Sequence, residues 1–280
     1  MKEFEVNKVY EGDCLEIMPA IPDNSIDMVL CDLPYGTTQN GWDGIIDLPS
    51  LWQEYKRILK GSGVVALTSQ GLFTASLIMS NTAMFKYKIA WIKSFPTNFL
   101  NAKKQPLRRH EDICIFYAKQ PVYHPQMQKG RPRYDKGSND DKQTGSYGVF
   151  EPKRKQNFNG MRYPTDALFI PDEHEEDWVS FKNAWTEGKA FHPNQKPVAL
   201  GRYLIRTYTN PGEVVLDNAC GSGSFLVAAV LEGRNYVGIE LNRHSFRLKT
   251  HAVDFIEVCR QRIEVAKNQW QTNANKLSLF

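Results

Sequence analysis

A carboxylate and an aromatic ring stand three residues apart where an apolar run of the sequence ends. The run at residues 25–32 closes on Asp32, and Leu33, Pro34 and Tyr35 follow it. A carboxylate and a backbone carbonyl can accept hydrogen bonds from both N–H groups of an amine, and a ring can stack on the base that carries it. Such acceptors stabilise the positive charge that develops on the nitrogen as it is methylated. Asp32, Leu33, Pro34 and Tyr35 are therefore candidate catalytic residues for methyl transfer to an aromatic amine.

A second candidate site is a glycine-containing turn between a strand-like run and a helix. The run at residues 213–217 ends in Asp217, and Gly221 and Gly223 then let the backbone turn tightly and approach a ligand. Glu240 ends the next predicted strand, where the dinucleotide-binding pattern has an acid for the ribose hydroxyls. The third glycine of that pattern is absent, and Asp217 would repel a pyrophosphate. S-Adenosylmethionine, a nucleoside with a cationic tail, fits these residues, and a turn that binds nothing is the alternative.

The elements that must position these residues alternate between strands and helices. Strands that read as unbroken apolar runs predict an α/β fold with a Rossmann-like, mostly parallel twisted sheet and helices on both faces. Ligands meet such a sheet at the carboxyl ends of its strands, so the two candidate sites should lie together. The predicted strands are residues 6–13, 25–32, 63–69, 85–93, 111–119, 213–217 and 235–242, and the predicted helices are residues 47–63, 71–81, 196–212, 224–234 and 243–269.

An irregular stretch interrupts this alternation. Residues 120–190 have no long apolar period and are rich in Gly, Pro, Asn, Lys and aromatic residues. We therefore predict a catalytic half at residues 1–119, an inserted irregular target-recognition region at 120–190 and a cofactor-binding half at 191–280. Residues 101–164 hold 14 Lys and Arg against 6 Asp and Glu, whereas residues 165–190 hold 2 against 7. The basic segment favours a polyanionic partner, and a solvated surface loop is the alternative.

Other classes of protein are disfavoured by composition. No apolar stretch is long enough to span a bilayer, and the N-terminus does not have the pattern of a secretory leader, so we expect a cytoplasmic protein with no membrane partner. The histidines lack metal-ligand spacing, and we predict no metal site. The five cysteines occur singly with no CxxC pair and are expected to be buried: Cys14, Cys31, Cys114, Cys220 and Cys259.

The two motifs together carry a family resemblance. DLPY at residues 32–35 with DNACGSGSF at residues 217–225 resembles the amino-group methyltransferases that modify adenine N6 or cytosine N4 in DNA. DLPY comes first, then a variable region, HPNQKP at residues 192–197 and the cofactor loop, an order similar to that of the permuted β group in bacteria and phages. The resemblance implies a nucleoid-associated cytoplasmic enzyme that uses S-adenosylmethionine and flips a base out of double-stranded DNA. A homodimer and a cognate restriction endonuclease are partners that it leaves open.

The resemblance also implies residue roles. Asp32 and the Leu33 carbonyl would hold the target amine, and Tyr35 would stack the flipped base; the family usually has proline where this chain has Leu33. The positions implied to bind the cofactor are Asp13, Asp32, Asn194, Lys196, Asp217, Ala219, Gly221, Gly223, Phe225, Glu240 and Asn242. The basic residues that we expect to contact DNA are Lys103, Lys104, Arg108, Arg109, Lys129, Arg131, Arg133, Lys153, Arg154 and Lys155.

The target of the reaction is open to several readings. Asp32 favours adenine N6, because cytosine-N4 members of the family more often resemble a serine form of the motif. Cytosine N4, an RNA base and a protein glutamine amide are alternatives, since the same amine chemistry serves each of them. A catalytically idle nucleic-acid-binding module is the alternative of a different class. Cytosine C5 methylation is disfavoured, because it needs a thiolate and the sequence has no Pro-Cys turn.

Overall fold

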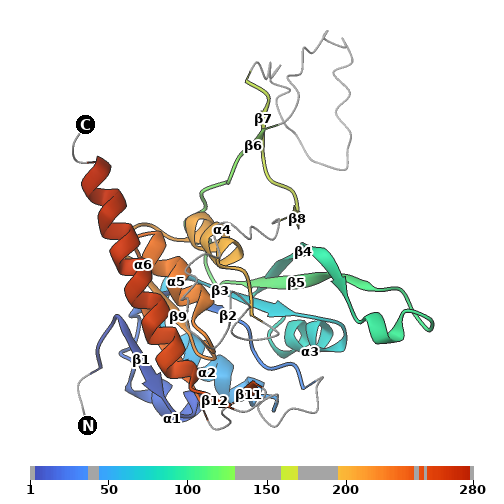
Figure 1. Ribbon diagram of the computed structural model, residues 1–280, viewed down its shortest axis with the longest axis horizontal. Helices are drawn as coiled ribbons and strands as arrows, with labels where there is room; N and C mark the ends of the chain where they lie inside the picture. Colours follow the sequence, from blue (N-terminus) through green and yellow to red (C-terminus); the bar gives the residue numbers. More distant parts are fainter. Residues whose placement is uncertain are drawn as a thin grey trace. The chain divides into compact units, whose positions relative to one another are not determined.

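The computed structural model describes residues 4–36, 44–129, 159–169, 195–242, 246–248 and 251–277 (Figure 1). The chain divides into two units, one formed by Met1–His124 and Asp166–Phe280 and the other by Pro125–Thr165. Among the described residues, no helix is both long and apolar enough to cross a membrane.

Eight strands of the first unit form one sheet in the order β1-β10-β9-β2-β3-β5-β4-β8. β5 runs antiparallel to its neighbours β3 and β4, and every other neighbouring pair in this sheet is parallel. The predicted α/β fold with a mostly parallel sheet is therefore confirmed. The strands are β1 (Lys8–Glu11), β2 (Ile26–Cys31), β3 (Leu59–Ser69), β4 (Phe85–Thr97), β5 (Arg108–Phe116), β8 (Ala167–Phe169), β9 (Val214–Asp217) and β10 (Asn235–Glu240).

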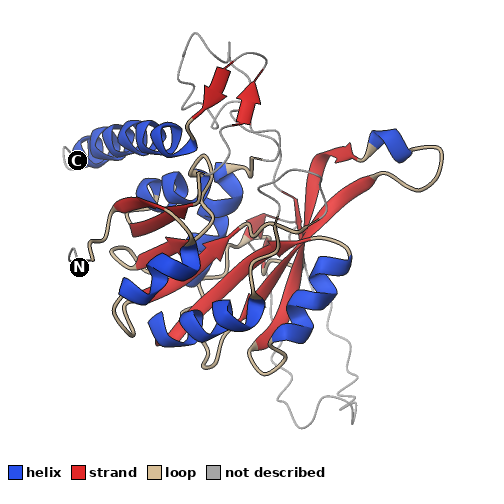
Figure 2. Ribbon diagram, turned by 90° about the horizontal axis from the view of Figure 1, so that it is seen from below, coloured by secondary structure: helices blue, strands red, loops and turns tan. Residues whose placement is uncertain are grey.

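Helices lie on both sides of this sheet (Figure 2). The alternation of side chains along a strand explains the two layers, since successive residues point to opposite faces. In β2, Met28 and Leu30 belong to one buried cluster with residues of α4, α5 and α6, whereas Val29 and Cys31 belong to a second with residues of α2 and α3. The helices are α1 (Cys14–Ile17), α2 (Leu48–Ile58), α3 (Leu72–Ser80), α4 (Val198–Tyr208), α5 (Ser224–Leu231) and α6 (Phe255–Leu277), with the short 3-10 helices η1 (Met18–Ala20) and η2 (Phe99–Asn101).

The last helix begins later than the sequence pattern predicts. We expected a helix over residues 243–269, but β11 (Phe246–Leu248) and β12 (His251–Val253) pair as an antiparallel ladder before α6. The Asp254 carboxylate accepts hydrogen bonds from the backbone N–H groups of Ile256 and Glu257, at 2.9 and 3.1 Å. This is the geometry of a helix N-cap, so the helix starts where its first free donors find an acceptor.

Short strands also occur within the range predicted to be an irregular insertion. β8 lies beside β4 in the main sheet, with Ala90 opposite Ala167. In the second unit, β6 (Gln128–Lys129) pairs antiparallel with β7 (Met161–Arg162). An edge strand of three residues has too few apolar positions to produce a period of two, which is why the pattern did not reveal it.

The strand order brings the two predicted sites to one place. β2 and β9 are parallel neighbours, with Val29 opposite Leu216. From this junction, β3 lies on the far side of β2 and β10 lies on the far side of β9, so the chain winds outward in opposite directions. A crevice at the carboxyl ends of the strands is expected at such a switch point. Asp32 follows β2 and the Gly221 turn follows β9, and both therefore reach this edge.

Candidate active site

The Asp32 carboxylate is held by three side chains. Its Oδ1 atom accepts hydrogen bonds from the Tyr35 hydroxyl, at 2.8 Å, and from the Thr68 hydroxyl. Its Oδ2 atom lies 2.6 Å from the Nζ atom of Lys196, and the two side chains are 27% and 10% exposed. Both oxygens of Asp32 thus face hydrogen-bond donors at the end of β2, and the contact with Lys196 is charge-assisted.

Lys196 connects this carboxylate to a second one on β5. Its Nζ atom lies 3.3 Å from Oε2 of Glu111, and Oε1 of Glu111 lies 2.9 Å from Nζ of Lys93 on β4. Burial lowers the pKa of Lys196, but the carboxylates of Asp32 and Glu111 outweigh burial and leave that pKa raised. Lys196 is therefore an ammonium at neutral pH. The four side chains form one row of alternating charge, Asp32–Lys196–Glu111–Lys93.

Tyr35 is fixed by its ring as well as by its hydroxyl. The ring stacks on Phe73 of α3, with centroids 5.1 Å apart and planes inclined by 26°. The Nζ atom of Lys196 lies 5.6 Å from the Tyr35 centroid, within the range of a cation–π contact. Burial, and then the charge of Asp32, raises the pKa of Tyr35 well above its usual value. The hydroxyl therefore stays protonated, and it lies within donating distance of both the Asp32 carboxylate, at 2.8 Å, and the Thr68 hydroxyl, at 3.0 Å.

The turn after β9 is organised around Glu240 at the end of β10. The N–H of Gly221 donates to Oε2 of Glu240 at 2.8 Å, and the N–H of Asn242 donates to Oε1 at 3.0 Å. Gly221 and Gly223 have φ angles of 49° and 80°, a conformation that favours glycine. A Cβ atom on Gly223 would overlap the Sγ atom of Cys259, whereas one on Gly221 would meet no atom within 4 Å. The turn is thus packed tightly at Gly223 and open at Gly221.

Asp217 places a buried carboxylate at the end of β9. Its side chain is 3% exposed, and its Oδ1 atom accepts the N–H of Ala219 at 3.3 Å. Burial raises its pKa from 3.8 to about 7. A buried carboxylate gains from a cation that reaches it, because the opposite charge offsets the loss of hydration. Asp217 is therefore suited to the cationic end of a ligand.

Other predicted site residues have structural contacts of their own. Asp13 caps α1, because its Oδ1 atom accepts the N–H of Leu15 at 2.9 Å. Leu33 is 3% exposed and packs in the same cluster as α2, so its backbone rather than its side chain is available to a ligand. Phe225 is 2% exposed, and it lies against Gly201, where a Cβ atom would approach the ring to 2.8 Å. Pro34 and Ala219 are half-buried, and Asn194 lies outside the described residues.

The basic residues fall into three groups. Four are exposed around the connection between β4 and β5: Lys103, Lys104, Arg108 and Arg109. Lys129 is exposed on β6 in the second unit. The remaining five lie outside the described residues: Arg131, Arg133, Lys153, Arg154 and Lys155.

Three participants in the site were not predicted. Thr68 stands at the end of β3, beside β2, and its position in a neighbouring parallel strand is a signal that could have identified it. The sequence pattern predicts a strand at Glu111 and a helix at Phe73 but indicates no chemical role for either residue. Their contacts with Lys196 and Tyr35 depend on the strand order, which sequence periodicity does not determine.

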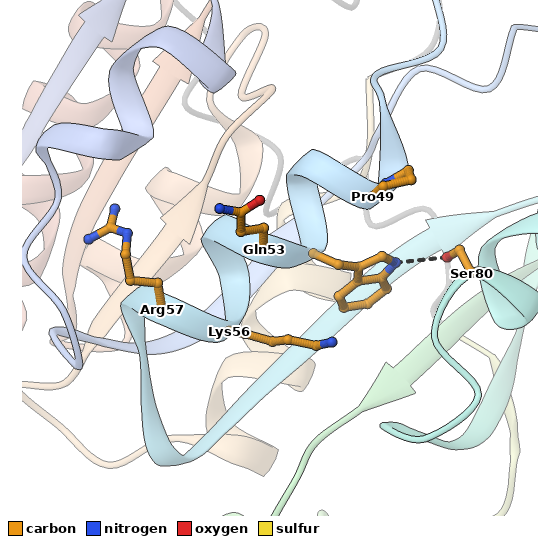
Figure 3. A pocket seen from close by; sticks show the side chains of 6 residues that line it. Pro49, Gln53, Lys56, Arg57 and Ser80 are labelled. Atoms are coloured by element: carbon orange, nitrogen blue, oxygen red, sulfur yellow. Dashed lines mark hydrogen bonds between the residues drawn. The ribbon is translucent and has the colours of Figure 1, made fainter.

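A pocket of about 610 Å³ lies elsewhere, on the outer side of α2 (Figure 3). Its indole, Trp52, donates from Nε1 to Oγ of Ser80 at 2.7 Å. Its lining contains no residue of the charged row or of the Gly221 turn: Pro49, Trp52, Gln53, Lys56, Arg57 and Ser80. Among the described residues, no cluster of His, Cys, Asp and Glu could hold a metal ion, and the five cysteines are free and buried.

The sequence of this chain matches a known protein family. The model of a DNA methylase family, the N6/N4 methylases, matches residues 26–250. This match covers well over half of the chain, so the chain belongs to the N6/N4 DNA methylase family. The resemblance drawn from DLPY and the glycine turn is confirmed.

Individual relatives agree with this assignment. The DNA adenine methyltransferase YhdJ of Escherichia coli is 27% identical over 274 residues, which cover 89% of this chain and 83% of that protein. The type II methyltransferase M2.MboI of Moraxella bovis is 22% identical, and the match covers 96% of this chain and 93% of that one.

Two solved structures share the fold. The complex of M1.HpyAVI with S-adenosylmethionine has a TM-score of 0.57 at 18% identity, covering 91% of this chain and 98% of that chain. The cytosine-N4-specific PvuII DNA methyltransferase has a TM-score of 0.60 at 14% identity, covering 94% and 92%.

Proposed function

We propose that this protein transfers a methyl group from S-adenosylmethionine to the N6 amine of an adenine extruded from double-stranded DNA. The observation that carries the proposal is the adjacency of β2 and β9, which brings the Asp32 carboxylate and the Gly221 turn to one edge of the sheet. Membership of the N6/N4 DNA methylase family supports the reaction class.

The residues around the turn fit the cofactor. Each oxygen of Glu240 accepts one backbone N–H and keeps a lone pair for a ribose hydroxyl. The open space beside Gly221 leaves room for a nucleoside next to the backbone. Asp217 would bind the ammonium group of the methionine part, since a cation would stabilise the charged form of its buried carboxylate. S-Adenosylmethionine supplies an activated methyl group. One of the solved structures that share the fold, that of M1.HpyAVI, is a complex with this cofactor.

Asp32 and the Leu33 carbonyl would hold the target amine. Both are acceptors, so they orient the two N–H groups and stabilise the charge that forms on nitrogen. In the structure, the Nζ atom of Lys196 lies 2.6 Å from Oδ2 of Asp32, where the amine would bind. A cation there would oppose a developing positive charge, so the amine must displace it. Glu111, already 3.3 Å from the same Nζ atom, is the acceptor toward which Lys196 would move.

Tyr35 and Phe73 would form the wall on which the flipped base stacks. Their rings are already arranged in a stack, and a base can extend it on the face that Lys196 now covers. The same displacement of Lys196 would therefore open both the acceptor and the ring. Adenine is the proposed base because Asp32 heads the motif and because the relative from Escherichia coli is named as a DNA adenine methyltransferase.

DNA would be held by the exposed basic residues, of which the structure places Lys103, Lys104, Arg108 and Arg109 around one hairpin connection. We expect a protein that works in the bacterial cytoplasm on nucleoid DNA. Light scattering of the purified protein tests whether it forms a homodimer. A search for an endonuclease active on the same DNA sequence tests whether it has a restriction partner.

The experiment that tests the function uses purified protein, unmethylated DNA and S-adenosylmethionine with a deuterated methyl group. Mass spectrometry of the digested nucleosides should find the label on N6 of deoxyadenosine. Label on N4 of deoxycytidine would support the same mechanism of methyl transfer but show that the target base is cytosine. Label on RNA or on a protein glutamine in parallel reactions, with none on DNA, would contradict the proposal. Cofactor binding with no transfer to any of them would favour an idle binding module.

A further inference from the structure

β4 and β5 continue past the rest of the sheet as a two-stranded arm, here defined as residues 93–111 (Figure 1). The last paired residues are Thr97 and Arg108, and residues 98–107 form the tip of the arm. Figure 2 shows η2 (Phe99–Asn101) at this tip. The arm belongs to the first unit, which also holds the candidate active site.

The tip exposes apolar side chains on an ordered turn. Phe99 and Leu100 are 75% and 85% exposed, so most of their apolar surface is in contact with solvent. The backbone beneath them is closed by hydrogen bonds from Asn101 to Asn98, at 3.0 Å, and from Ala102 to Phe99, at 3.1 Å. The Asn101 amide also donates to the Asn98 side chain at 2.7 Å. The fold therefore presents the two side chains outward instead of packing them, which is the mark of a contact surface.

The charges around the tip indicate what it contacts. Residues 98–109 contain four basic residues and no acidic one: Lys103, Lys104, Arg108 and Arg109. All four are exposed. An apolar pair surrounded by cations complements a polyanion with an apolar interior, such as the phosphate backbone and base stack of DNA. A surface for a neutral protein partner would not need this excess of positive charge.

The base of the arm is tied to the candidate active site. Lys93 of β4 and Glu111 of β5 form an ion pair at 2.9 Å, and Lys196 links Glu111 to Asp32. Arg108 stands three residues from Glu111, a distance of about 10 Å along a strand. The length of this strand segment, from Glu111 to Arg108, is similar to the depth of a DNA groove, which is roughly 8 Å. DNA whose base enters the site beside Asp32 would therefore meet the tip of the arm.

We propose that the arm is a wedge for base extrusion, with Phe99 and Leu100 inserting into the DNA stack beside the target base. The four basic residues in and next to the tip would hold the phosphates: Lys103, Lys104, Arg108 and Arg109. The inference rests on the proposed action on DNA. An apolar wedge lowers the free energy of the extruded state, because it covers base faces that the departing nucleotide leaves unstacked. Its contribution should vanish when the target base is already unpaired.

The test compares the double variant Phe99→Ala/Leu100→Ala with the control Leu72→Ala/Met79→Ala. The control residues are also strongly exposed, at 84% and 73%, but lie on α3. Extrusion is followed by fluorescence on duplexes that carry 2-aminopurine, which has no 6-amino group, at the target position. Methylation is measured on matching duplexes that carry adenine at that position, and both kinds of duplex are prepared with the target paired or mispaired. We expect the arm variant to lose at least tenfold in extrusion and methylation of the paired target, and to recover to within about threefold of wild type on the mispaired one. The control should match wild type on both.

Three results would contradict the proposal that the arm is a wedge for base extrusion. Equal losses on paired and mispaired DNA would make the tip a general binding surface, and unchanged extrusion would leave it without a role in DNA binding. Loss of binding to phosphatidylserine vesicles, with DNA extrusion intact, would assign it to a membrane surface. Failure of the proposed function looks different, because wild-type protein would then methylate neither duplex. Thermal unfolding of both variants checks that the exposed substitutions leave the fold intact.

Discussion

The Nζ atom of Lys196 lies 2.6 Å from Oδ2 of Asp32, so the carboxylate expected to hold the target amine already holds a side-chain cation. The same ammonium reaches Glu111 and lies over the ring of Tyr35. One residue from the segment before α4 thus covers both the acceptor and the stacking surface of the site. The shared cation offsets the charge of two largely buried carboxylates, and in the proposed reaction its contact with Asp32 is the one that the target amine would break.

Replacing Lys196 should destabilise the protein, because two largely buried carboxylates lose their shared cation. We expect Lys196→Gln to lower the free energy of unfolding by about 2–3 kcal/mol. The matched control is Lys267→Gln, which removes an exposed pair with Glu264 and should cost less than about 1 kcal/mol. Urea denaturation at pH 7.5 measures both. Equal stabilities for the two variants would show that the Asp32–Lys196 pair contributes nothing to the fold.

Asp217 should make stability depend on pH. Burial raises its pKa from 3.8 to about 7 in the folded protein, so the folded state keeps a proton that the unfolded state has lost between these values. The free energy of unfolding therefore falls as the pH rises from 4 to 7, and the loss is complete above 7. Asp217→Asn removes this loss and should stabilise the ligand-free protein by ~2–4 kcal/mol at pH 8, and by little at pH 4.

The control for this prediction is Asp166→Asn, which changes an exposed carboxylate. Thermal or urea unfolding between pH 4 and 8 gives the profile for each variant. A stability difference between Asp217→Asn and wild type that stays constant over this range would mean that Asp217 titrates at its ordinary pKa.

The two glycines of the Gly221 turn, which is proposed to bind the cofactor, should respond differently to alanine. Gly223→Ala forces a Cβ atom onto Cys259 and strains a φ of 80°, so it should lower stability by about 2–4 kcal/mol. Gly221→Ala adds strain at a φ of 49° but meets open space, so it should cost only about 1 kcal/mol while weakening S-adenosylmethionine binding tenfold or more.

Gly71→Ala is the control for strain alone, since its φ of 59° is similar and its Cβ atom would also meet open space, before α3. Calorimetric titration with S-adenosylmethionine separates the effects. If Gly221→Ala binds the cofactor as tightly as Gly71→Ala, the open space beside Gly221 is not the nucleoside site.

The exposed lysines at the arm should act on DNA through phosphates. Lys103→Gln/Lys104→Gln should weaken binding to all DNA sequences and reduce the slope of log affinity against log salt by about 2. Lys56→Gln/Lys119→Gln changes two other exposed lysines and serves as the control. Fluorescence anisotropy over a range of salt concentrations measures the slope. The same slope for both double variants would place Lys103 and Lys104 away from the DNA.

The two halves of the candidate site could be predicted from the sequence because each lies at a strand end with a recognisable pattern. Asp32 closes an apolar run, and Asp217 with its glycines stands between a strand and a helix. Both patterns are local, and the rule that ligands bind at the carboxyl ends of parallel strands then joins them. The structure places them on neighbouring strands, as that rule requires.

Contacts between distant strands could not be predicted in this way. Glu111 reaches Lys196 because β5 is inserted antiparallel between β3 and β4, and the apolar period of a strand does not reveal its neighbours. The packing of the Phe225 ring against Gly201 likewise joins α5 to α4, and the expected contact of Phe225 with the cofactor stays a prediction. The start of α6 was missed because the capping by Asp254 outweighs the helical pattern of the residues before it.

Asp32 is proposed to take part in methylating adenine in DNA. The most direct measurement is single-molecule sequencing of genomic DNA from a methylation-free host that expresses either the wild-type protein or Asp32→Ala. We predict N6-methyladenine at one short sequence motif in the wild-type culture and none in the variant, although the purified variant still binds S-adenosylmethionine. The same mark in both cultures would remove Asp32 from the reaction, and N4-methylcytosine or an unmarked genome in the wild-type culture would contradict the proposed target.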